Sequence, residues 1–151
     1  MKKQILLVVD DEQEIRDALS RHFRFLGYEV MTASNGVEAL EILAHETVAI
    51  IISDIMMPVM DGVELLRVVR KEYPMVRLII ITGYVTQENV LACMRHDADT
   101  CIFKPWPDMT ELEDAVRAAF DRINLWKRKL HILLDMKPSE SPSALDPGHE
   151  H

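Results

Sequence analysis

The stretch Ile50-Ile51-Ile52-Ser53-Asp54-Ile55-Met56-Met57-Pro58-Val59-Met60-Asp61-Gly62 decides the fold of this chain. It is an apolar run that ends at one acid and continues into a Met-Met-Pro turn and an Asp-Gly pair. An isoleucine-rich run bounded by turn residues is typical of a strand that is buried on both faces of a sheet. Asp54 then lies at the carboxyl end of that strand, where open α/β sheets bind their ligands. Because a carboxylate is rarely fully buried unless it is paired or bound to a metal, Asp54 is expected either at an open mouth or at a metal site.

The rest of the chain alternates between short apolar runs and segments with helical spacing. The expected strands are residues 4–9, 29–33, 48–53, 76–81 and 100–103. The expected helices are residues 14–26, 37–45, 63–73 and 86–96, and a final helix that opens at Pro107 and Asp108. Such alternation predicts an α/β fold with right-handed crossovers, in which helices cover a doubly wound, five-stranded parallel sheet.

Length, charge and cysteine content exclude several classes of protein. The 151 residues leave room for one ordinary domain and a short appendage. The net charge of −8 argues against a surface for nucleic acid or an anionic membrane. No apolar run approaches the ~20 residues that a membrane helix needs, and the N-terminal run is too short for a signal peptide, so we expect a cytoplasmic protein. Cys93 and Cys101 lack the CxxC spacing of a zinc site, and the prediction for both is a reduced packing residue.

Polar residues that can do chemistry follow the ends of the predicted strands. Asp10-Asp11 follows the first strand, Asp54 the third, Thr82 the fourth and Lys104 the fifth. In a parallel sheet these strand ends lie along one edge, so three carboxylates, a hydroxyl and an ammonium are expected around one mouth. A hard divalent cation suits such a carboxylate cluster, and Mg²⁺ binds one or two carboxylates together with waters and a phosphate oxygen. The lysine and the hydroxyl can hold the other oxygens of a phosphoryl group.

This ordered set resembles the response-regulator receiver domain (CheY-like) of two-component signal transduction. The resemblance covers about residues 3–121 and includes the Asp54-to-Gly62 stretch, Thr82-Gly83 and Lys104-Pro105. It implies a flavodoxin-like sheet with strand order 2-1-3-4-5 and a receiver domain over residues 1–121. It also implies a phosphoacceptor of a His-Asp phosphorelay, which is not an enzyme with a catalytic domain of its own.

The resemblance assigns the acceptor and the metal ligands. Asp54 takes the phosphoryl group from a sensor histidine kinase or a phosphotransfer protein. Asp11 and Asp54 bind Mg²⁺ directly, Asp10 acts mainly through water, and the backbone carbonyl of Met56 completes the ligands; Mn²⁺ is an alternative ion.

The resemblance also assigns a switch. Lys104 contacts Asp54 and then the phosphoryl oxygens, Thr82 is the hydroxyl that moves toward the phosphate, and the bond before Pro105 is expected to be cis. Phosphorylation then changes the face formed by the fourth helix, the fifth strand and the final helix, which binds an unknown downstream protein. The family usually has an aromatic switch residue at the position of Cys101, so the resemblance does not assign to this chain the usual coupled movement of the threonine and the aromatic ring.

The C-terminal segment has a pattern of its own. Residues 122–136 are predicted to extend the final helix, and residues 137–151 to be a disordered tail rich in proline and serine. The apolar residues of the extension follow a heptad seam made of Ile123, Trp126, Leu130 and Leu133. This seam needs a partner, which is either a second copy of the chain or the protein's own surface.

Four other functions compete with this interpretation. The chain could be the receiver portion of a longer regulator that carries a phosphodiesterase or transcription-activator domain. It could also be a pseudo-receiver scaffold that binds partners without phosphorylation. A haloacid-dehalogenase-like phosphatase needs Asp-x-Asp after the first strand, where this chain has Glu12 in place of the second aspartate. A dinucleotide-binding domain needs a glycine-rich first turn, which is missing here.

Overall fold

The computed structural model describes residues 4–83, 86–104 and 108–136. The predicted cis bond at Pro105 and the predicted tail, residues 137–151, lie outside these residues. The chain divides into two compact units, Met1–Phe120 and Asp121–His151, which are treated separately below.

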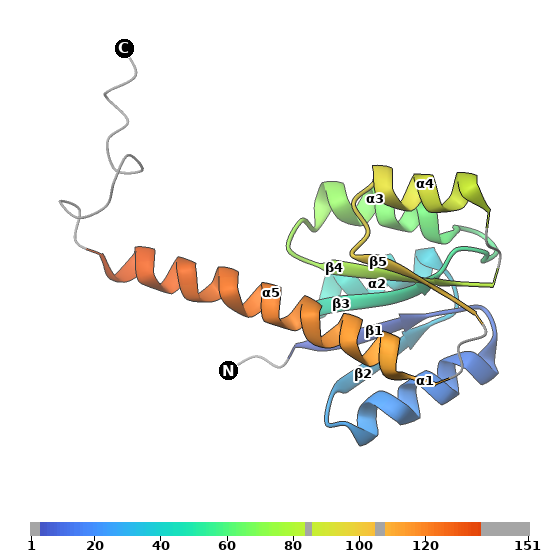
Figure 1. Ribbon diagram of the computed structural model, residues 1–151, viewed down its shortest axis with the longest axis horizontal. Helices are drawn as coiled ribbons and strands as arrows, with labels where there is room; N and C mark the ends of the chain where they lie inside the picture. The colour runs from blue at the N-terminus through green and yellow to red at the C-terminus, as the bar shows by residue number, and fades with distance from the viewer. Residues whose placement is uncertain (1–3, 84–85, 105–107, 137–151) are drawn as a thin grey trace, which may run out of the picture. The chain divides into compact units, whose positions relative to one another are not determined.

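Ten elements alternate along the described chain, as the sequence predicts (Figure 1). The strands are β1 (Ile5–Val9), β2 (Glu29–Ala33), β3 (Val48–Asp54), β4 (Arg77–Thr82) and β5 (Thr100–Phe103). The helices are α1 (Gln13–Phe25), α2 (Gly36–His45), α3 (Gly62–Glu72), α4 (Gln87–Arg95) and α5 (Thr110–Asp135).

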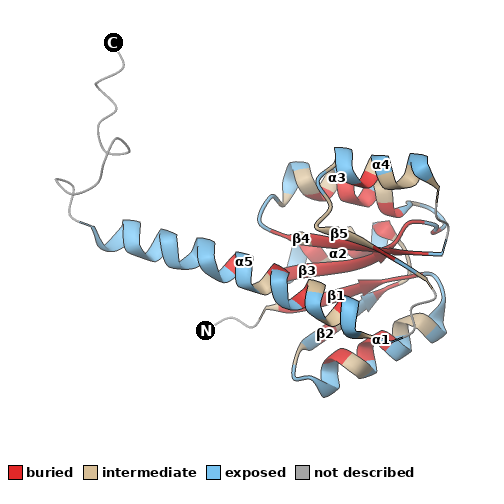
Figure 2. Cartoon of the chain, in the orientation of Figure 1, coloured by how far each residue is buried: buried red, intermediate tan, exposed pale blue. Residues whose placement is uncertain are grey.

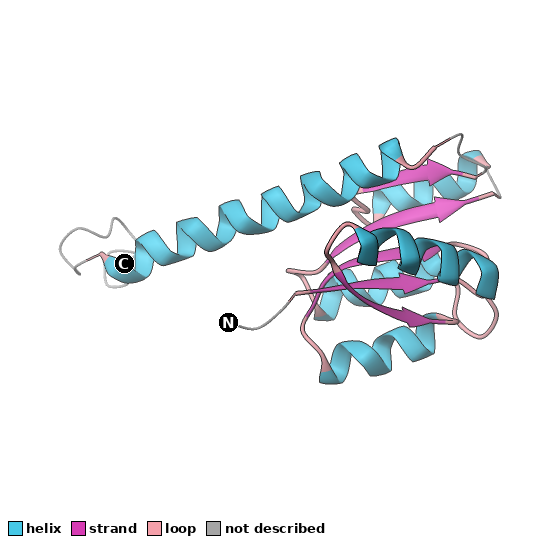
Figure 3. Ribbon diagram, turned by 90° about the horizontal axis from the view of Figure 1, so that it is seen from below, coloured by secondary structure: helices cyan, strands magenta, loops and turns pink. Residues whose placement is uncertain are grey.

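The five strands form one parallel sheet with the order β2-β1-β3-β4-β5. Their arrows point the same way in Figure 3. This order confirms the predicted doubly wound, flavodoxin-like fold. Because β1 and β3 are neighbours at its centre, the residues that follow β1 and end β3 come close together at the carboxyl edge.

The core lies on both faces of the sheet (Figure 2). On one face, alternate strand residues such as Leu7, Ile51 and Ile80 pack in a cluster with buried residues of α2, α3 and α4. Residues of the opposite parity, such as Val8 and Ile52, are also fully buried. Buried residues of α1 and of the first part of α5 supply that second face, namely Leu19, Phe23, Leu112, Val116 and Ala119. Burial on both faces explains why β1 and β3 are continuous apolar runs in the sequence.

Side-chain caps explain where most helices begin. The side chains of Asn35, Asp61 and Thr86 accept hydrogen bonds from the backbone N–H three residues later, at the starts of α2, α3 and α4. The final helix begins at Thr110, slightly later than the prediction from Pro107 and Asp108. Asp108 lies before the helix, and its carboxylate accepts a hydrogen bond from the N–H of Thr110 at 2.8 Å.

The second unit is described here as a single helical segment up to Met136. Along it Ile123 is buried, whereas Trp126 is 60% exposed, Leu130 54% and Leu133 42%. Three of the four predicted seam residues are therefore open to solvent in a single chain. In the described parts of the chain, no helix is long and apolar enough to cross a membrane.

Replacing Val59 with glycine is expected to stabilise the protein. Val59 lies in the loop after β3 with a φ of 71°, and its side chain is 79% exposed. A β-branched residue is strained in this left-handed region, while glycine is not. We expect Val59→Gly to raise the free energy of unfolding by about 1 kcal/mol, since the left-handed strain of ~1–2 kcal/mol exceeds the extra chain entropy of glycine.

Urea denaturation of the two proteins measures this difference. Val37→Gly is the matched control, because Val37 is a partly exposed valine in the first turn of α2, where glycine relieves no strain and should cost about 0.5 kcal/mol. A Val59→Gly protein as destabilised as the control would contradict the predicted strain.

Candidate functional site

Asp54 is the last residue of β3 and is only 6% exposed. Its Oδ1 accepts a hydrogen bond from the backbone N–H of Ile55 at 2.7 Å and a longer one from that of Met56 at 3.4 Å. These bonds hold one carboxylate oxygen toward the following loop. The loop after β3 folds back on its own start, because the N–H of Gly62 donates a hydrogen bond to the carbonyl of Ile55 at 2.8 Å.

Lys104 joins two buried acids. Its Nζ lies 2.9 Å from Oδ2 of Asp54 and 3.0 Å from Oδ2 of Asp10, which is fully buried. Asp10 follows β1 and Lys104 follows β5, so three strands supply the three groups. The structure thus brings together residues that lie up to 94 positions apart in the sequence, at the edge where the prediction placed them.

The charges of Asp10, Asp54 and Lys104 influence one another. Burial alone would lower the pKa of the Lys104 ammonium, but the hydrogen bonds and charges of Asp54 and Asp10 outweigh burial and raise the pKa above its ordinary value of 10.5. Lys104 is therefore a permanent cation near neutral pH. It neutralises part of the repulsion between the two carboxylates.

Thr82 and Cys101 lie on the strands that lead into this site. Thr82 ends β4 and is 1% exposed, and its carbonyl accepts a hydrogen bond from the backbone N–H of Lys104 at 2.7 Å. Cys101 is partly buried on β5 and packs against the core cluster on the face of α4. The backbone of Thr82 is thus tied directly to the residue that binds both acids.

The carboxylates can also hold a metal ion. Asp10, Glu12 and Asp54 each bring one carboxylate oxygen into a group whose members lie within 4.8 Å of one another. Three carboxylates with one ammonium leave two negative charges uncompensated, and oxygen donors of this kind suit Mg²⁺ or Mn²⁺. The donor set therefore fits the ion that the resemblance implies.

The predicted direct binding of the ion by Asp11 stays a prediction. Asp11 is exposed and is not a member of the Asp10–Glu12–Asp54 group. Glu12 is in that group, and its backbone N–H donates to Oδ1 of Asp10 at 2.9 Å. Glu12 was not among the residues predicted from the sequence, and the structure adds it to them as a candidate oxygen donor.

Two further contacts shape the site and were not predicted. Arg16, in the first turn of α1, donates to the backbone carbonyl of Asp10 at 2.6 Å. Ser53 donates through its hydroxyl to the carbonyl of Asp54 at 2.8 Å. Both bonds fix the backbone of an acid, so they position its carboxylate.

Comparisons with known proteins agree with this geometry. The sequence model of the response regulator receiver domain matches residues 6–117. A probable transcriptional regulator, ycf27, from Cyanidium caldarium is 36% identical over 83% of this chain and 49% of its own length. The chain thus spans about half the length of that curated relative.

Solved structures agree as well. A CheY-like receiver domain protein from Methanospirillum hungatei JF-1 superposes with a TM-score of 0.77 at 31% identity, covering 82% of this chain and 98% of that one. The response regulator protein TrrA from Thermotoga maritima, in complex with Mg²⁺ and BeF, gives a TM-score of 0.70 at 33% identity, with 77% and 98% covered.

The chain belongs to the response regulator receiver domain family. Receivers of this family are generally signalling domains and not separate catalytic domains. They take phosphoryl groups from histidine kinases and bind Mg²⁺ at a cluster of acidic side chains. The Asp10–Glu12–Asp54 group is likewise a cluster of acidic side chains.

Proposed function

We propose that Asp54 is the phosphoacceptor of a His-Asp phosphorelay and that its phosphorylation switches the face formed by α4, β5 and α5. The observation that carries this proposal is the Asp10–Lys104–Asp54 bridge at the carboxyl edge of the sheet. Phosphoryl transfer needs positioning and charge neutralisation more than covalent help, and the bridge supplies both.

The residues of the chain have separate tasks in this transfer. A carboxylate oxygen of Asp54 attacks the phosphorus of the donor, and the bond from phosphorus to the donor's leaving group breaks. Lys104, already 2.9 Å from Oδ2 of Asp54, stabilises the charge that collects on the phosphoryl oxygens. The hydroxyl of Thr82 is the group that responds to the new charge of about −2.

Mg²⁺ would be held by acids at the mouth and by the backbone carbonyl of Met56. When bound, the ion supplies charge neutralisation between the acceptor and the incoming phosphoryl oxygens. Asp11 and Asp54 are the proposed direct ligands, and Asp10 acts mainly through water. Glu12, whose carboxylate lies within 4.8 Å of those of Asp10 and Asp54, can supply a further oxygen.

The proposed donor is a sensor histidine kinase or a phosphotransfer protein. An open, largely apolar hollow of about 630 Å³ lies beside the site and is lined by α1 and by residues next to the strand ends, namely Ile15, Ala18, Leu19, His22, Gly83, Lys104 and Met109. A helix that carries the phosphohistidine can dock there, with its histidine directed toward Lys104 and Asp54.

Labelling with radioactive acetyl phosphate and Mg²⁺ tests the acceptor. The protein is expected to take up about one phosphoryl group per chain, Asp54→Ala is expected to take up none, and chelation of Mg²⁺ should abolish uptake. Asp17→Ala, which removes an exposed acid of α1, is the matched control and should label normally.

Other outcomes separate the rival functions. An unlabelled wild-type protein would support the pseudo-receiver scaffold. Turnover of a phosphate ester in excess over protein would support the phosphatase.

We also propose that residues 122–136 form a dimer seam between two copies of the chain. Trp126, Leu130 and Leu133 follow heptad spacing and are 42–60% exposed, and apolar side chains at this spacing are typical of helix pairing. Helix α5 ends at Asp135, so the part after Asp121 is short, and we expect weak pairing that phosphorylation strengthens.

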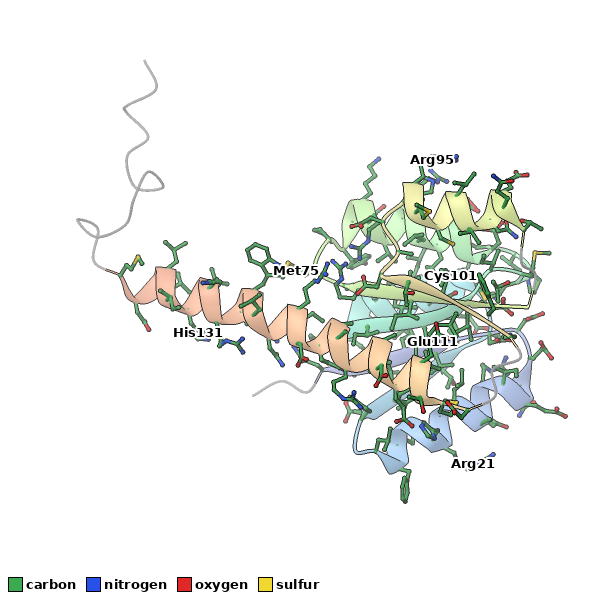
Figure 4. All side chains as sticks on the ribbon, viewed as in Figure 1. Arg21, Met75, Arg95, Cys101, Glu111 and His131 are labelled. Atoms are coloured by element: carbon green, nitrogen blue, oxygen red, sulfur yellow. The ribbon has the colours of Figure 1, made fainter. Side chains whose placement is uncertain are left out.

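Light scattering with and without beryllofluoride, a mimic of the phosphoryl group, measures this pairing. We expect a shift from monomer to dimer, and Leu130→Glu should abolish it because it places a charge in the seam. His131→Glu adds the same charge one residue away, off the seam, and should keep the shift (His131 is labelled in Figure 4). Equal behaviour of the two variants would count against the seam and point to a different partner.

A longer regulator remains the alternative favoured by the comparisons. The ycf27 relative is about twice the length matched here. Attached to a phosphodiesterase or transcription-activator domain, the receiver would pass its signal through α5.

A further inference from the structure

The chain has two cysteines, and they lie on α4 and β5, two of the elements that form the proposed switch face. Cys93 is in the last turn of α4 and is 3% exposed. Cys101 is on the edge strand β5, is partly exposed, and is labelled in Figure 4. Cys101 packs against the core cluster that contains Cys93, and both thiols are free.

The two thiols lie within hydrogen-bonding reach of each other. A side-chain hydrogen bond joins the thiols, and this bond lowers the pKa of Cys93 although burial opposes the change. The same bond, together with burial, raises the pKa of Cys101. The two thiols therefore titrate as a pair, and the thiolate that forms on either sulfur is the nucleophile.

We propose that Cys93 and Cys101 are a modification site: a peroxide-class oxidant converts the pair to an intramolecular disulfide that ties α4 to β5. The proposal rests on the packing of both cysteines in one cluster, the partial exposure of Cys101 and the contact between α4 and β5, which carry them.

The reaction balances with hydrogen peroxide as the oxidant. The sulfur of one cysteine attacks one peroxide oxygen, the O–O bond breaks, and the other oxygen leaves as water, so that cysteine becomes a sulfenic acid. The sulfur of the other cysteine then attacks the sulfur of the sulfenic acid and expels the remaining oxygen as a second water. The thiols lose two electrons to the peroxide, and their two protons are carried away in the two waters.

The disulfide would change the structure of the switch face. A disulfide holds its sulfurs about 2.05 Å apart, closer than any hydrogen bond, so oxidation draws the end of α4 toward β5. Cys101 occupies the position where the family usually has an aromatic switch residue. The disulfide therefore restricts the movement of α4 and β5, the elements that phosphorylation is proposed to shift. Formation of the disulfide is independent of the proposed function, whereas its regulatory effect rests on that function.

Intact-mass spectrometry after brief treatment of the full chain with hydrogen peroxide tests the modification. We expect the monomer to lose two hydrogen atoms and both free thiols, and dithiothreitol to restore them. With only two cysteines, an intramolecular disulfide has one connectivity. Two thiols that still react with maleimide, or a product made only of sulfinic acids or linked dimers, would overturn the proposal. This measurement uses the wild-type chain, so it does not depend on whether Cys93→Ser folds.

A second measurement separates this proposal from the phosphoacceptor function. Hydrogen exchange of the amides of α4 is followed in reduced and oxidised protein, each with and without beryllofluoride. We expect exchange in α4 to slow at least several-fold on oxidation and to stop responding to beryllofluoride. Cys101→Ser should respond to beryllofluoride with or without peroxide. If the disulfide forms but beryllofluoride does not change the exchange of α4 in the reduced protein, the proposed switch is wrong and the modification stands. If beryllofluoride changes the exchange of α4 as much in the oxidised protein as in the reduced one, the regulatory effect is refuted.

Discussion

Replacing Lys104 with methionine is expected to destabilise the metal-free protein by about 3 kcal/mol, because it leaves two buried carboxylates without their shared cation. The side chain of Lys104 is only 14% exposed, that of Asp54 is 8% exposed, and that of Asp10 is fully buried. Methionine keeps most of the side-chain volume, so the change is mainly one of charge. Urea denaturation in the presence of a chelator measures it.

A double-mutant cycle identifies the cause of this loss. Adding Asp54→Asn to Lys104→Met removes one of the two repelling charges, so the double variant should recover at least about 1 kcal/mol relative to additivity. Strictly additive effects would show that Lys104 acts through packing alone. Lys71→Met is the matched control, because Lys71 is an exposed lysine of α3 and its replacement should change stability by less than about 0.5 kcal/mol.

The pH dependence of the free energy of unfolding is an independent test of the contribution of Lys104. The pKa of Lys104 is raised in the folded protein, chiefly because the bonds and charges of Asp54 and Asp10 outweigh its burial. Its contribution is therefore fully present below the unfolded pKa, near 10.5, and is lost as the pH rises through the higher folded pKa. The stability difference between wild type and Lys104→Met should stay constant near neutral pH and shrink only in strong alkali. A difference that shrinks on acidification through neutral pH would contradict this assignment.

The fold was predictable because its physical cause is local in the sequence. Strands buried on both faces, such as Ile5–Val9 and Val48–Asp54, appear as uninterrupted apolar runs, and alternation with helices leaves few arrangements other than a parallel sheet. The meeting of Asp10, Asp54 and Lys104 follows from this topology alone, since parallel strands end at one edge.

Side-chain direction was not predictable in the same way. Asp11 and Glu12 follow the same strand end, and only the path of the backbone after β1 determines that Glu12 joins Asp10 and Asp54. The contact of Cys93 with Cys101 depends on how the turn between α4 and β5 packs, where Asp97 adopts a φ of 60°. No residue spacing in the sequence reports such packing.

Gly62→Ala is expected to destabilise the protein by about 3 kcal/mol, at the upper end of overpacking effects. A Cβ at this position would lie 2.1 Å from the carbonyl oxygen of Asp54 and 2.9 Å from both the carbonyl carbon of Asp54 and the Cα of Ile55. These are backbone atoms, so no side-chain rotation relieves the clash. The strand end that carries the acceptor must move, although alanine would otherwise favour the start of α3 by up to about 1 kcal/mol.

Two other glycines make the test specific. At Gly36 a Cβ would approach the side chain of Met60 at 2.7 Å, and because that chain is flexible, Gly36→Ala should cost less than about 1.5 kcal/mol. At Gly83 the nearest atom is Cβ of Lys104 at 3.7 Å, an ordinary contact, so Gly83→Ala should leave the free energy of unfolding nearly unchanged.

The rate of phosphoryl labelling of the three glycine variants should follow the same order as their free energies of unfolding. Labelling by acetyl phosphate, measured in the absence of urea, should slow most in Gly62→Ala, because that variant displaces the backbone of Asp54 itself. If Gly62→Ala were as stable as Gly83→Ala, the close approach of α3 to the acceptor would be wrong. If it were unstable yet labelled at the wild-type rate, the loop would tolerate the displacement, and the position of Asp54 would depend on the Lys104 bridge more than on the backbone behind it.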